Sequence, residues 1–404
     1  MGAPVLADPD PLQQAIDVVS DVELTPGDAV AHHVGVVAGA WRAGGGEVRV
    51  MSGDGDATVG DRYTPVRDPG DHFRIGSVSK MLVAAVVLQL AEEGVISPSR
   101  PAGVGQLDAP LSETALPDGI LENLKNWLGV PAGYDEDLIT VGQLLQHRSG
   151  VMNWVNDVWV QTTRIGGPAA LTSGNRYGTW TMADFLKAIE DDPAVPPGGT
   201  VSYSNTNYLL LGLLIDNTVG PYQQEIQDRI LTPLGMTETS IPTAAPVTNT
   251  LPAPHSKHFA NLFIGSSTAS TFGIHEYTDL NPTVMGAAGD VVSTTSDLNR
   301  FLTGLLSGQL LAPATLAKMK TTSPIPTPPG TPAQGDMGFG VQRLTVDCPS
   351  GPDVPVWGHP GGWHGSLTWA YASEDGSHSL AYNFNMDFAE QLTNRDTILK
   401  AEFC

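Results

Sequence analysis

Strand-like patterns lie at both ends of this 404-residue chain, and helix-like patterns fill most of the region between them. Near the N-terminus, residues 33–41 and 47–52 are typical of strands on either side of a glycine turn at 43–46. Further strands are expected over 338–346, 354–358, 366–373 and 378–384, with a hairpin turn at Asp375-Gly376. A sheet that contains strands from both ends must carry the middle of the chain as an inserted region.

This arrangement predicts an α/β (α+β) fold with an antiparallel sheet, flanking helices and an inserted region that is mainly helical. We expect residues 1–76 and 290–404 to form the sheet domain and residues 77–289 the helical domain of one folded unit. Helices are expected over 10–21, 77–93, 205–218, 222–231, 296–306, 313–320 and 388–403. The helix over 77–93 is apolar almost all round and ends at Gly94, so it should be buried.

An excess of acidic side chains limits the partners of this chain. It has 43 Asp and Glu residues against 20 Lys and Arg residues, which gives a formal net charge of −23. Such a surface repels phosphate backbones and anionic lipids, so nucleic acid is not expected as a partner. No apolar run approaches the roughly 18 residues that a membrane helix needs, so no membrane span is expected either.

Only two cysteines occur, Cys348 and Cys404. They are either unrelated buried thiols or one disulfide, which would indicate an oxidising compartment and stabilise the fold by roughly 4 kcal/mol. Neither lies in a Cys-x-x-Cys or His-rich context, so no metal site is expected. The first ten residues lack the basic start and apolar core of a signal peptide. We therefore expect a mature secreted or extracytoplasmic chain; the alternative is a cytoplasmic protein with two free thiols.

The first chemical motif is Ser77-Val-Ser-Lys80, at the start of the apolar helix. A serine and a lysine three residues apart lie on one helix face. The helix N-terminus favours negative charge near the serine, and burial would lower the pKa of the lysine so that it can accept a proton. The serine could therefore act as a nucleophile and the lysine as its base. An N-cap serine beside a lysine that reaches for solvent would give the same pattern.

The second motif is Tyr203-Ser-Asn205, just before the apolar helix expected over 205–218. A phenol at this place can shuttle a proton, and an amide can hold a substrate carbonyl. Taken alone, the motif fits a tyrosine at a strand end followed by an N-cap asparagine better than it fits a catalytic site.

The third motif is His359-Pro-Gly361, in the C-terminal strand region. It would place an imidazole beside a site, where glycine lets a substrate approach the backbone closely. His364 could compete for the role, and so could His33, which begins another His-x-Gly. We favour His359, because His33 precedes the serine and stands in a plain strand.

The motifs Ser-x-x-Lys, Tyr-x-Asn and His-x-Gly, in this order, resemble those of the penicillin-recognising serine hydrolases. This superfamily includes class C β-lactamases, low-molecular-weight DD-peptidases and related esterases. Four supporting segments are also similar: 73–77, 139–150, 233–236 and 289–297. Within the superfamily the chain looks most like the secreted D-alanyl-D-alanine carboxypeptidases of actinomycetes. The resemblance implies a β-lactamase/transpeptidase-like fold, a Cys348–Cys404 disulfide, and neither metal nor organic cofactor.

The resemblance also implies a role for each motif. Ser77 would attack an amide or ester carbonyl and form an acyl-enzyme, while Lys80 and Tyr203 take up its proton. Which of these two is the base stays open. Asn205 would hold the acyl amide. His359 would bond to Tyr203 and help to keep the site electropositive.

The remaining substrate contacts implied by the resemblance come from backbone and aromatic groups. The oxyanion hole would be formed by the backbone N–H groups of Ser77 and Gly362, beside Gly361. Trp159 and Trp363 are candidate pocket walls, although both fit core packing equally well.

The chain departs from the carboxypeptidases at the positions that would grip a terminal carboxylate. Pro360 and Gly362 stand where hydroxyl-bearing residues are common, and Gln342 stands where an arginine would align. Arg343 is adjacent, but neighbouring strand residues point to opposite faces. Weak anchoring of a carboxylate favours esters, amides or internal D-peptide bonds as substrates.

We therefore expect a monomeric serine hydrolase of DD-peptidase type, a penicillin-binding D-alanyl-D-alanine carboxypeptidase. Its substrate would be a small molecule or peptide, such as a D-amino-acid peptide, an ester or a β-lactam. The alternatives are an esterase, a D-amino-acid amidase or a D-specific peptidase on the same machinery. A β-lactamase and a non-catalytic penicillin-binding sensor come after these. The chain has neither the Gly-x-Ser-x-Gly of α/β-hydrolases nor the His-Glu-x-x-His of zinc peptidases.

Overall fold

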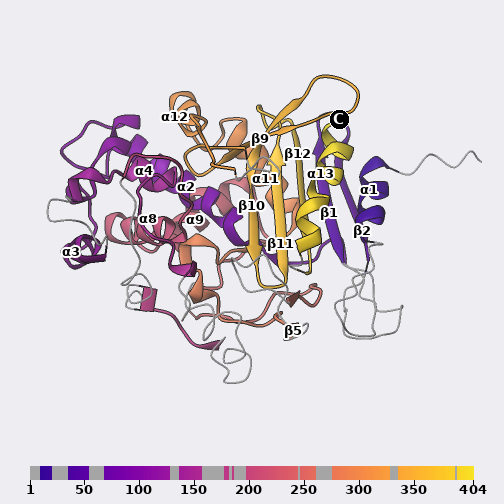
Figure 1. Cartoon of the computed structure of the whole chain (residues 1–404), viewed down its shortest axis with the longest axis horizontal. Coiled ribbons are helices and arrows are strands. Elements are labelled where there is room, and N and C mark those ends of the chain that lie inside the picture. Colours follow the sequence, from indigo (N-terminus) through magenta and orange to yellow (C-terminus); the bar gives the residue numbers. More distant parts are fainter. Residues whose placement is uncertain are drawn as a thin grey trace, which may run out of the picture.

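The computed structural model describes residues 10–20, 35–53, 68–127, 136–156, 177–181, 184–185, 197–243, 246–260, 275–327, 335–386 and 389–404. Its largest element is an eight-stranded sheet with antiparallel pairing between neighbours (Figure 1). In spatial order the strands are β2 (Gly46–Ser52), β1 (Val36–Arg42), β12 (His378–Phe384), β11 (Ser366–Ala372), β10 (Val354–Trp363), β9 (Gln342–Val346), β8 (Asp336–Met337) and β7 (Ser323–Pro324). The two ends of the chain meet where β1 pairs with β12, with Ala38 opposite Tyr382. The expected sheet built from both ends is confirmed.

Helices lie on both sides of this sheet and fill the middle of the chain. They are α1 (Pro11–Ser20), α2 (Ser79–Glu93), α3 (Asp118–Trp127), α4 (Val141–Leu145), α8 (Asn205–Thr218), α9 (Tyr222–Ile226), α10 (Thr232–Leu234), α11 (Thr295–Leu306), α12 (Pro313–Met319) and α13 (Ala389–Phe403). Two short pairs of strands complete the structure: β3 (Phe73–Arg74) with β6 (Val292–Ser293), and β4 (Phe259–Ala260) with β5 (His275–Glu276).

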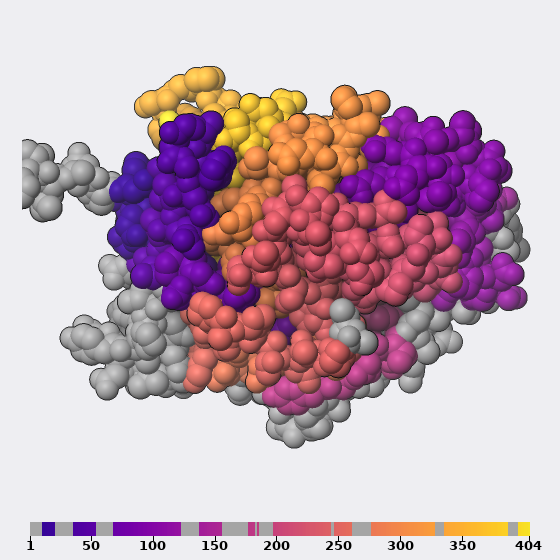
Figure 2. Space-filling model, turned by 180° about the vertical axis from the view of Figure 1, so that it is seen from behind, coloured from indigo at the N-terminus to yellow at the C-terminus, as the bar shows by residue number. Residues whose placement is uncertain are grey.

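The alternation of side chains along β1 divides the core into two layers. Val36 and Ala38 face a cluster formed with α1 and α13, whereas Val37 faces the larger cluster that contains α2 and α11. In Figure 1, α1 and α13 lie at one side of the sheet and the inserted helical region lies at the other. Figure 2 shows the segment with α8 to α10 covering the middle of the back face.

Helix α2 runs through the larger cluster and is buried along almost its whole length, as its apolar sequence predicts. It ends at Gly94, whose φ of 75° is the left-handed conformation that closes many helices. Because α2 has no solvent-exposed face until its last turn, its first turn lies deep in the molecule.

The two ends of the described chain are tied together by charge and by a covalent bond. Arg42 forms ion pairs with Asp10 at 2.7 Å and with Glu402 of α13 at 2.6 Å. A disulfide joins Cys348 to Cys404 across 56 residues of sequence. These links hold α1 and α13 on the same face of the sheet.

Two boundaries of the C-terminal strands differ from those expected by more than one residue. The first C-terminal strand begins at Gln342 rather than at residue 338, because Gly340 adopts a φ of 83° in a turn. Strand β10 continues to Trp363, five residues beyond its expected end, and so includes the His359 motif. Within the described residues, no helix has both the length and the apolar character for a bilayer span.

Candidate active site

Ser77 and Lys80 lie at the buried start of α2. Ser77 belongs to a 3₁₀ turn, Gly76–Val78, directly before the helix, and Lys80 is in its first turn. Lys80 is fully buried, and its Nζ lies 3.0 Å from Ser77 Oγ. Burial lowers the pKa of Lys80 well below its ordinary value, because the charged ammonium would lose its hydration.

Two acceptors hold the other side of the Lys80 amine. Its Nζ donates to Asn205 Oδ1 at 2.7 Å and to the carbonyl oxygen of Ala288 at 2.5 Å. Both oxygens can only accept hydrogen bonds. A neutral amine that gives its two hydrogens to them turns its lone pair toward Ser77, which is the arrangement of a base beside a nucleophile.

The phenol of Tyr203 is the next group around Ser77. Lys80 Nζ lies 5.3 Å from the centre of the Tyr203 ring. Burial raises the pKa of Tyr203 well above its ordinary value, and the neighbouring Ser77 hydroxyl acts in the opposite direction. No hydrogen bond of regular geometry reaches the phenol oxygen from the described residues. The phenol is therefore protonated and able to donate to a bound molecule.

His359 differs in two ways from what the resemblance implied. Its ring lies 6.1 Å from that of Tyr203, and its Nδ1 donates to the carbonyl oxygen of Pro360 at 2.5 Å instead of bonding to the phenol. Burial and the nearby Lys80 lower the pKa of His359 to about 3, so the ring is neutral and supplies no positive charge. His364 stacks on Tyr277, and His33 lies outside the described residues.

Strand β10 is packed tightly against the serine turn through two glycines. Gly76 has a φ of 52°, and a Cβ there would lie 2.6 Å from the carbonyl oxygen of Gly362. A Cβ on Gly361 would lie only 1.9 Å from the oxygen of Ile75. The backbone of Gly362 thus lies beside that of Ser77, whose N–H is in a first turn without an intrahelical acceptor.

The residues predicted to line the pocket with aromatic rings, and those at the positions that would bind a substrate carboxylate, do not form an open, positively charged pocket. Trp159 lies outside the described residues, and Trp363 is only 3% exposed, in the core beneath Arg74. Gln342 is buried and accepts a hydrogen bond from Tyr371, while Arg343 faces Asp336 at 3.7 Å. Neither offers a free positive charge beside Ser77.

Sequence reasoning missed two residues that hold the Tyr203-Ser-Asn205 segment. Asn153 Oδ1 accepts from the backbone N–H of Asn205 at 3.0 Å and from Asn205 Nδ2 at 3.2 Å. The ring of His147 stacks on Tyr203, with ring centres 4.1 Å apart. Both follow α4, in or just beyond the segment that supported the resemblance, but neither has a periodic or spacing signal of its own.

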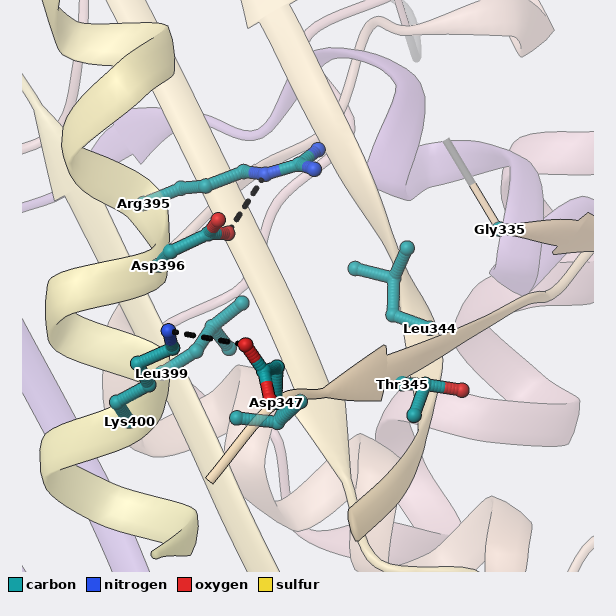
Figure 3. A pocket seen from close by; sticks show the side chains of 9 residues that line it. Gly335, Leu344, Thr345, Asp347, Arg395, Asp396, Leu399 and Lys400 are labelled. Carbon is teal, nitrogen blue, oxygen red and sulfur yellow. Dashed lines mark hydrogen bonds and ion pairs between the residues drawn. The ribbon is translucent and has the colours of Figure 1, made fainter. Parts of the chain in front are cut away.

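A cavity of about 310 Å³ lies away from these residues, between β9 and α13 (Figure 3). In it Lys400 of α13 faces Asp347 at 3.8 Å, and Arg395 bonds to the adjacent Asp396 at 3.1 Å. This cavity is on the face of the sheet opposite α2. It has no part in the chemistry of Ser77. Within the described ranges, no group of three or more His, Cys, Asp or Glu side chains could hold a metal ion.

This chain is similar to a known protein family and to several solved structures. The family model described as Beta-lactamase matches residues 25–402. The structure is similar to a D-stereospecific amidohydrolase from Streptomyces sp., with 32% identity, 98% and 99% of the two chains covered and a TM-score of 0.76. It shares its fold with a D-amino acid amidase from Ochrobactrum anthropi SV3, at 21% identity, 97% coverage of both chains and a TM-score of 0.69.

Among curated sequences, the chain is similar to penicillin-binding protein 4* of Bacillus subtilis, at 25% identity. The alignment covers 81% of this chain and 63% of that protein. A shorter likeness, 28% identical over 166 residues, joins the chain to penicillin-binding protein 4 of Amycolatopsis lactamdurans and covers 41% of this chain and 34% of that protein. The chain therefore spans less than two thirds of the length of these relatives.

Proposed function

Because the chain belongs to the beta-lactamase family of serine hydrolases, we propose that it hydrolyses amide bonds next to D-configured residues through an acyl-enzyme on Ser77. The strongest support is the likeness to a D-stereospecific amidohydrolase, which extends over nearly the full length of both chains. Arg343, adjacent to the position that would align with a carboxylate-binding arginine, faces Asp336 at 3.7 Å, which also supports an uncharged amide over a terminal carboxylate as the group that is recognised.

In the first step Lys80 acts as the base. Its lowered pKa leaves a neutral amine, whose lone pair takes the Ser77 Oγ proton across 3.0 Å. The serine oxygen then forms a bond to the carbonyl carbon, and the negative charge on the carbonyl oxygen is stabilised by the N–H groups of Ser77 and Gly362. The raised pKa of Tyr203 keeps the phenol protonated, so that no phenolate is available to act as the base, which supports Lys80 in this role.

In the second step the carbon–nitrogen bond breaks and the leaving nitrogen needs a proton. Tyr203 donates its phenol proton to that nitrogen and regains one from Lys80, so the amine leaves neutral and the acyl group stays on Ser77. A water molecule then repeats the sequence in reverse and releases the acid. Asn205, held by Lys80 on one side and Asn153 on the other, presents its remaining N–H to the substrate.

The second candidate function is a penicillin-binding DD-carboxypeptidase, which is favoured by the likeness to penicillin-binding proteins. The two candidates differ in the charge of the group that follows the scissile bond. A carboxypeptidase requires a free carboxylate there, whereas an amidase or an internal D-peptidase does not.

A pair of matched peptides tests this difference. We expect N-acetyl-D-alanyl-D-alanine with an amidated C-terminus to be hydrolysed at least as fast as its free acid. We also expect D-phenylalaninamide to exceed L-phenylalaninamide in kcat/KM by about 100-fold or more. Ser77→Ala should abolish hydrolysis of all four substrates. A strong preference for the free acid would overturn the amide proposal in favour of the carboxypeptidase, and equal rates for the two enantiomers would overturn D-specificity.

A further inference from the structure

His147 is held in a strained conformation beside the site. Its φ is 53°, and it is the one non-glycine residue with a positive φ among those that the structure describes. The residue is fully buried. A left-handed backbone at a bulky residue costs free energy and persists only where surrounding contacts maintain it.

Those contacts converge on three consecutive residues, 202–204, which overlap the second motif. The carbonyl oxygen of His147 accepts from the N–H of Ser202 at 2.8 Å, and its Nδ1 accepts from the N–H of Ser204 at 3.1 Å. Between these two bonds the imidazole stacks on the Tyr203 ring, with centres 4.1 Å apart and planes inclined by 28°. The left-handed backbone of His147 allows one residue to hold both neighbours of Tyr203 and its ring.

The protonation state of His147 is fixed by its partners. Asn207 Nδ2 lies 3.2 Å from Nδ1, and the Asn207 amide is oriented by Ser149, which donates to its Oδ1 at 2.6 Å. Two donors therefore face Nδ1, which must be the unprotonated nitrogen. Burial also lowers the pKa of His147 well below its ordinary value. The ring against Tyr203 is a neutral plane.

The oxygen end of Tyr203, by contrast, has no regular hydrogen bond within the described residues. The position of the phenol oxygen is therefore set by contacts on the ring and by the flanking backbone. We propose that His147 is a positioning residue for Tyr203: its stacked imidazole and its two bonds to Ser202 and Ser204 aim the phenol at the leaving group. This inference rests on the proposed role of Tyr203 as proton donor.

The proposal predicts a dependence on the leaving group. An amide or anilide leaves only when its nitrogen is protonated, whereas nitrophenolate leaves without help. General acid catalysis contributes about 10² to 10⁴ in rate. If the Tyr203 phenol is displaced, we therefore expect hydrolysis of D-phenylalanine nitroanilide to slow far more than hydrolysis of the nitrophenyl ester of the same acid. A loss of general structure would slow both substrates alike.

His147→Asn is the sharpest variant. Asparagine tolerates a positive φ and keeps a side-chain acceptor near the Ser204 N–H, so the change removes mainly the ring. We expect kcat/KM for the nitroanilide to fall by about 10- to 100-fold and that for the ester by less than about threefold. Tyr203→Phe gives the reference pattern, and Ser77→Ala should be inactive on both substrates.

The double variant His147→Asn/Tyr203→Phe completes the test. If His147 acts through Tyr203, the double variant is no slower on the nitroanilide than Tyr203→Phe alone. Equal losses on both substrates in His147→Asn, or additive losses in the double variant, would overturn the inference. These outcomes differ from a failure of the proposed function, in which the wild type would not turn over D-configured substrates or Ser77→Ala would remain active.

Discussion

At the scale of single residues, the site depends on charges removed by burial. Lys80 and His359 are both buried, and burial lowers the pKa of each side chain, so the folded site disfavours a positive charge on either of them. The neutral Lys80 amine has two fixed acceptors, Asn205 and Ala288, and one nucleophile in front of it. This environment supports the proposed uncharged amide as substrate.

Burial of Lys80 predicts that the free energy of unfolding changes with pH. Unfolding restores the ordinary pKa of Lys80, so between its lowered value and about pH 10 the unfolded chain holds one more proton than the folded chain. The free energy of unfolding should therefore rise with pH over that range, by up to about 1.4 kcal/mol per unit. Urea unfolding of the wild type and Lys80→Met between about pH 8 and pH 10 measures this. The same slope in both proteins would contradict the lowered pKa.

Removing the hydrogen bonds that Asn153 accepts should affect activity rather than overall stability. Asn153 fixes the Asn205 amide by accepting from both its backbone and its side chain. Asn153→Leu should lower kcat/KM for a D-amide by about tenfold, which is the value of one to two hydrogen bonds. Asn153→Asp keeps the acceptor and is the matched control, so it should retain most of the activity. An equally large loss of kcat/KM in Asn153→Asp would contradict the prediction that the hydrogen bonds accepted by Asn153 are what support activity.

At the scale of elements, the site lies where the start of one helix, one strand and the segment before a second helix come together. Strand β10 supplies the Gly361 and Gly362 backbone, α2 supplies Ser77 and Lys80, and the residues before α8 supply Tyr203. The close packing of β10 on the serine turn is what places the proposed oxyanion donors side by side.

Two adjacent glycines give a matched test of that packing. In Gly361→Ala the new Cβ would overlap the Ile75 oxygen, so β10 must move away from Ser77; we expect kcat to fall by about 10² or more. In Gly362→Ala the new Cβ would meet only Leu367, at an ordinary 3.7 Å, and the backbone N–H remains. That variant should stay active. Steady-state kinetics with thermal melting as the fold control would measure both, and equal activities would contradict the packing argument.

The sequence allowed the elements to be predicted better than the environment of the site. The helix over Asn205–Thr218 was predicted at its observed bounds because its apolar run is continuous, and α2 was predicted to be buried for the same reason. The extension of β10 was missed because Pro360 and the following glycines carry no strand signal. The neutral state of His359 was missed because burial is a property of the whole fold. His147 was missed because stacking between distant segments leaves no spacing pattern.

At the scale of the whole molecule, the sheet has a catalytic face and a structural face. Ser77 and its neighbours lie with α2 on one face, while α1, α13 and the Cys348–Cys404 disulfide lie on the other. The disulfide supports the proposal that the protein works in an oxidising compartment. Stability and catalysis should therefore respond separately to changes at the disulfide.

The double variant Cys348→Ser/Cys404→Ser tests that separation. Opening a loop closed across 56 residues should lower the free energy of unfolding by roughly 4 kcal/mol. Below the melting temperature, kcat/KM should stay within about twofold of the wild type, because no described contact links the disulfide to Ser77. Urea unfolding and steady-state kinetics on the same preparations measure the two quantities. A large loss of kcat/KM in a folded variant would contradict the division into two faces.

In the proposed mechanism Ser77 carries the acyl group during turnover. The most direct measurement is the intact mass of the protein, quenched during turnover of the nitrophenyl ester of D-phenylalanine, followed by peptide mapping. We predict one added acyl group on the peptide that contains Ser77, and neither adduct nor turnover in Ser77→Ala. Undiminished turnover in Ser77→Ala, or an acyl group mapped to another residue, would contradict it.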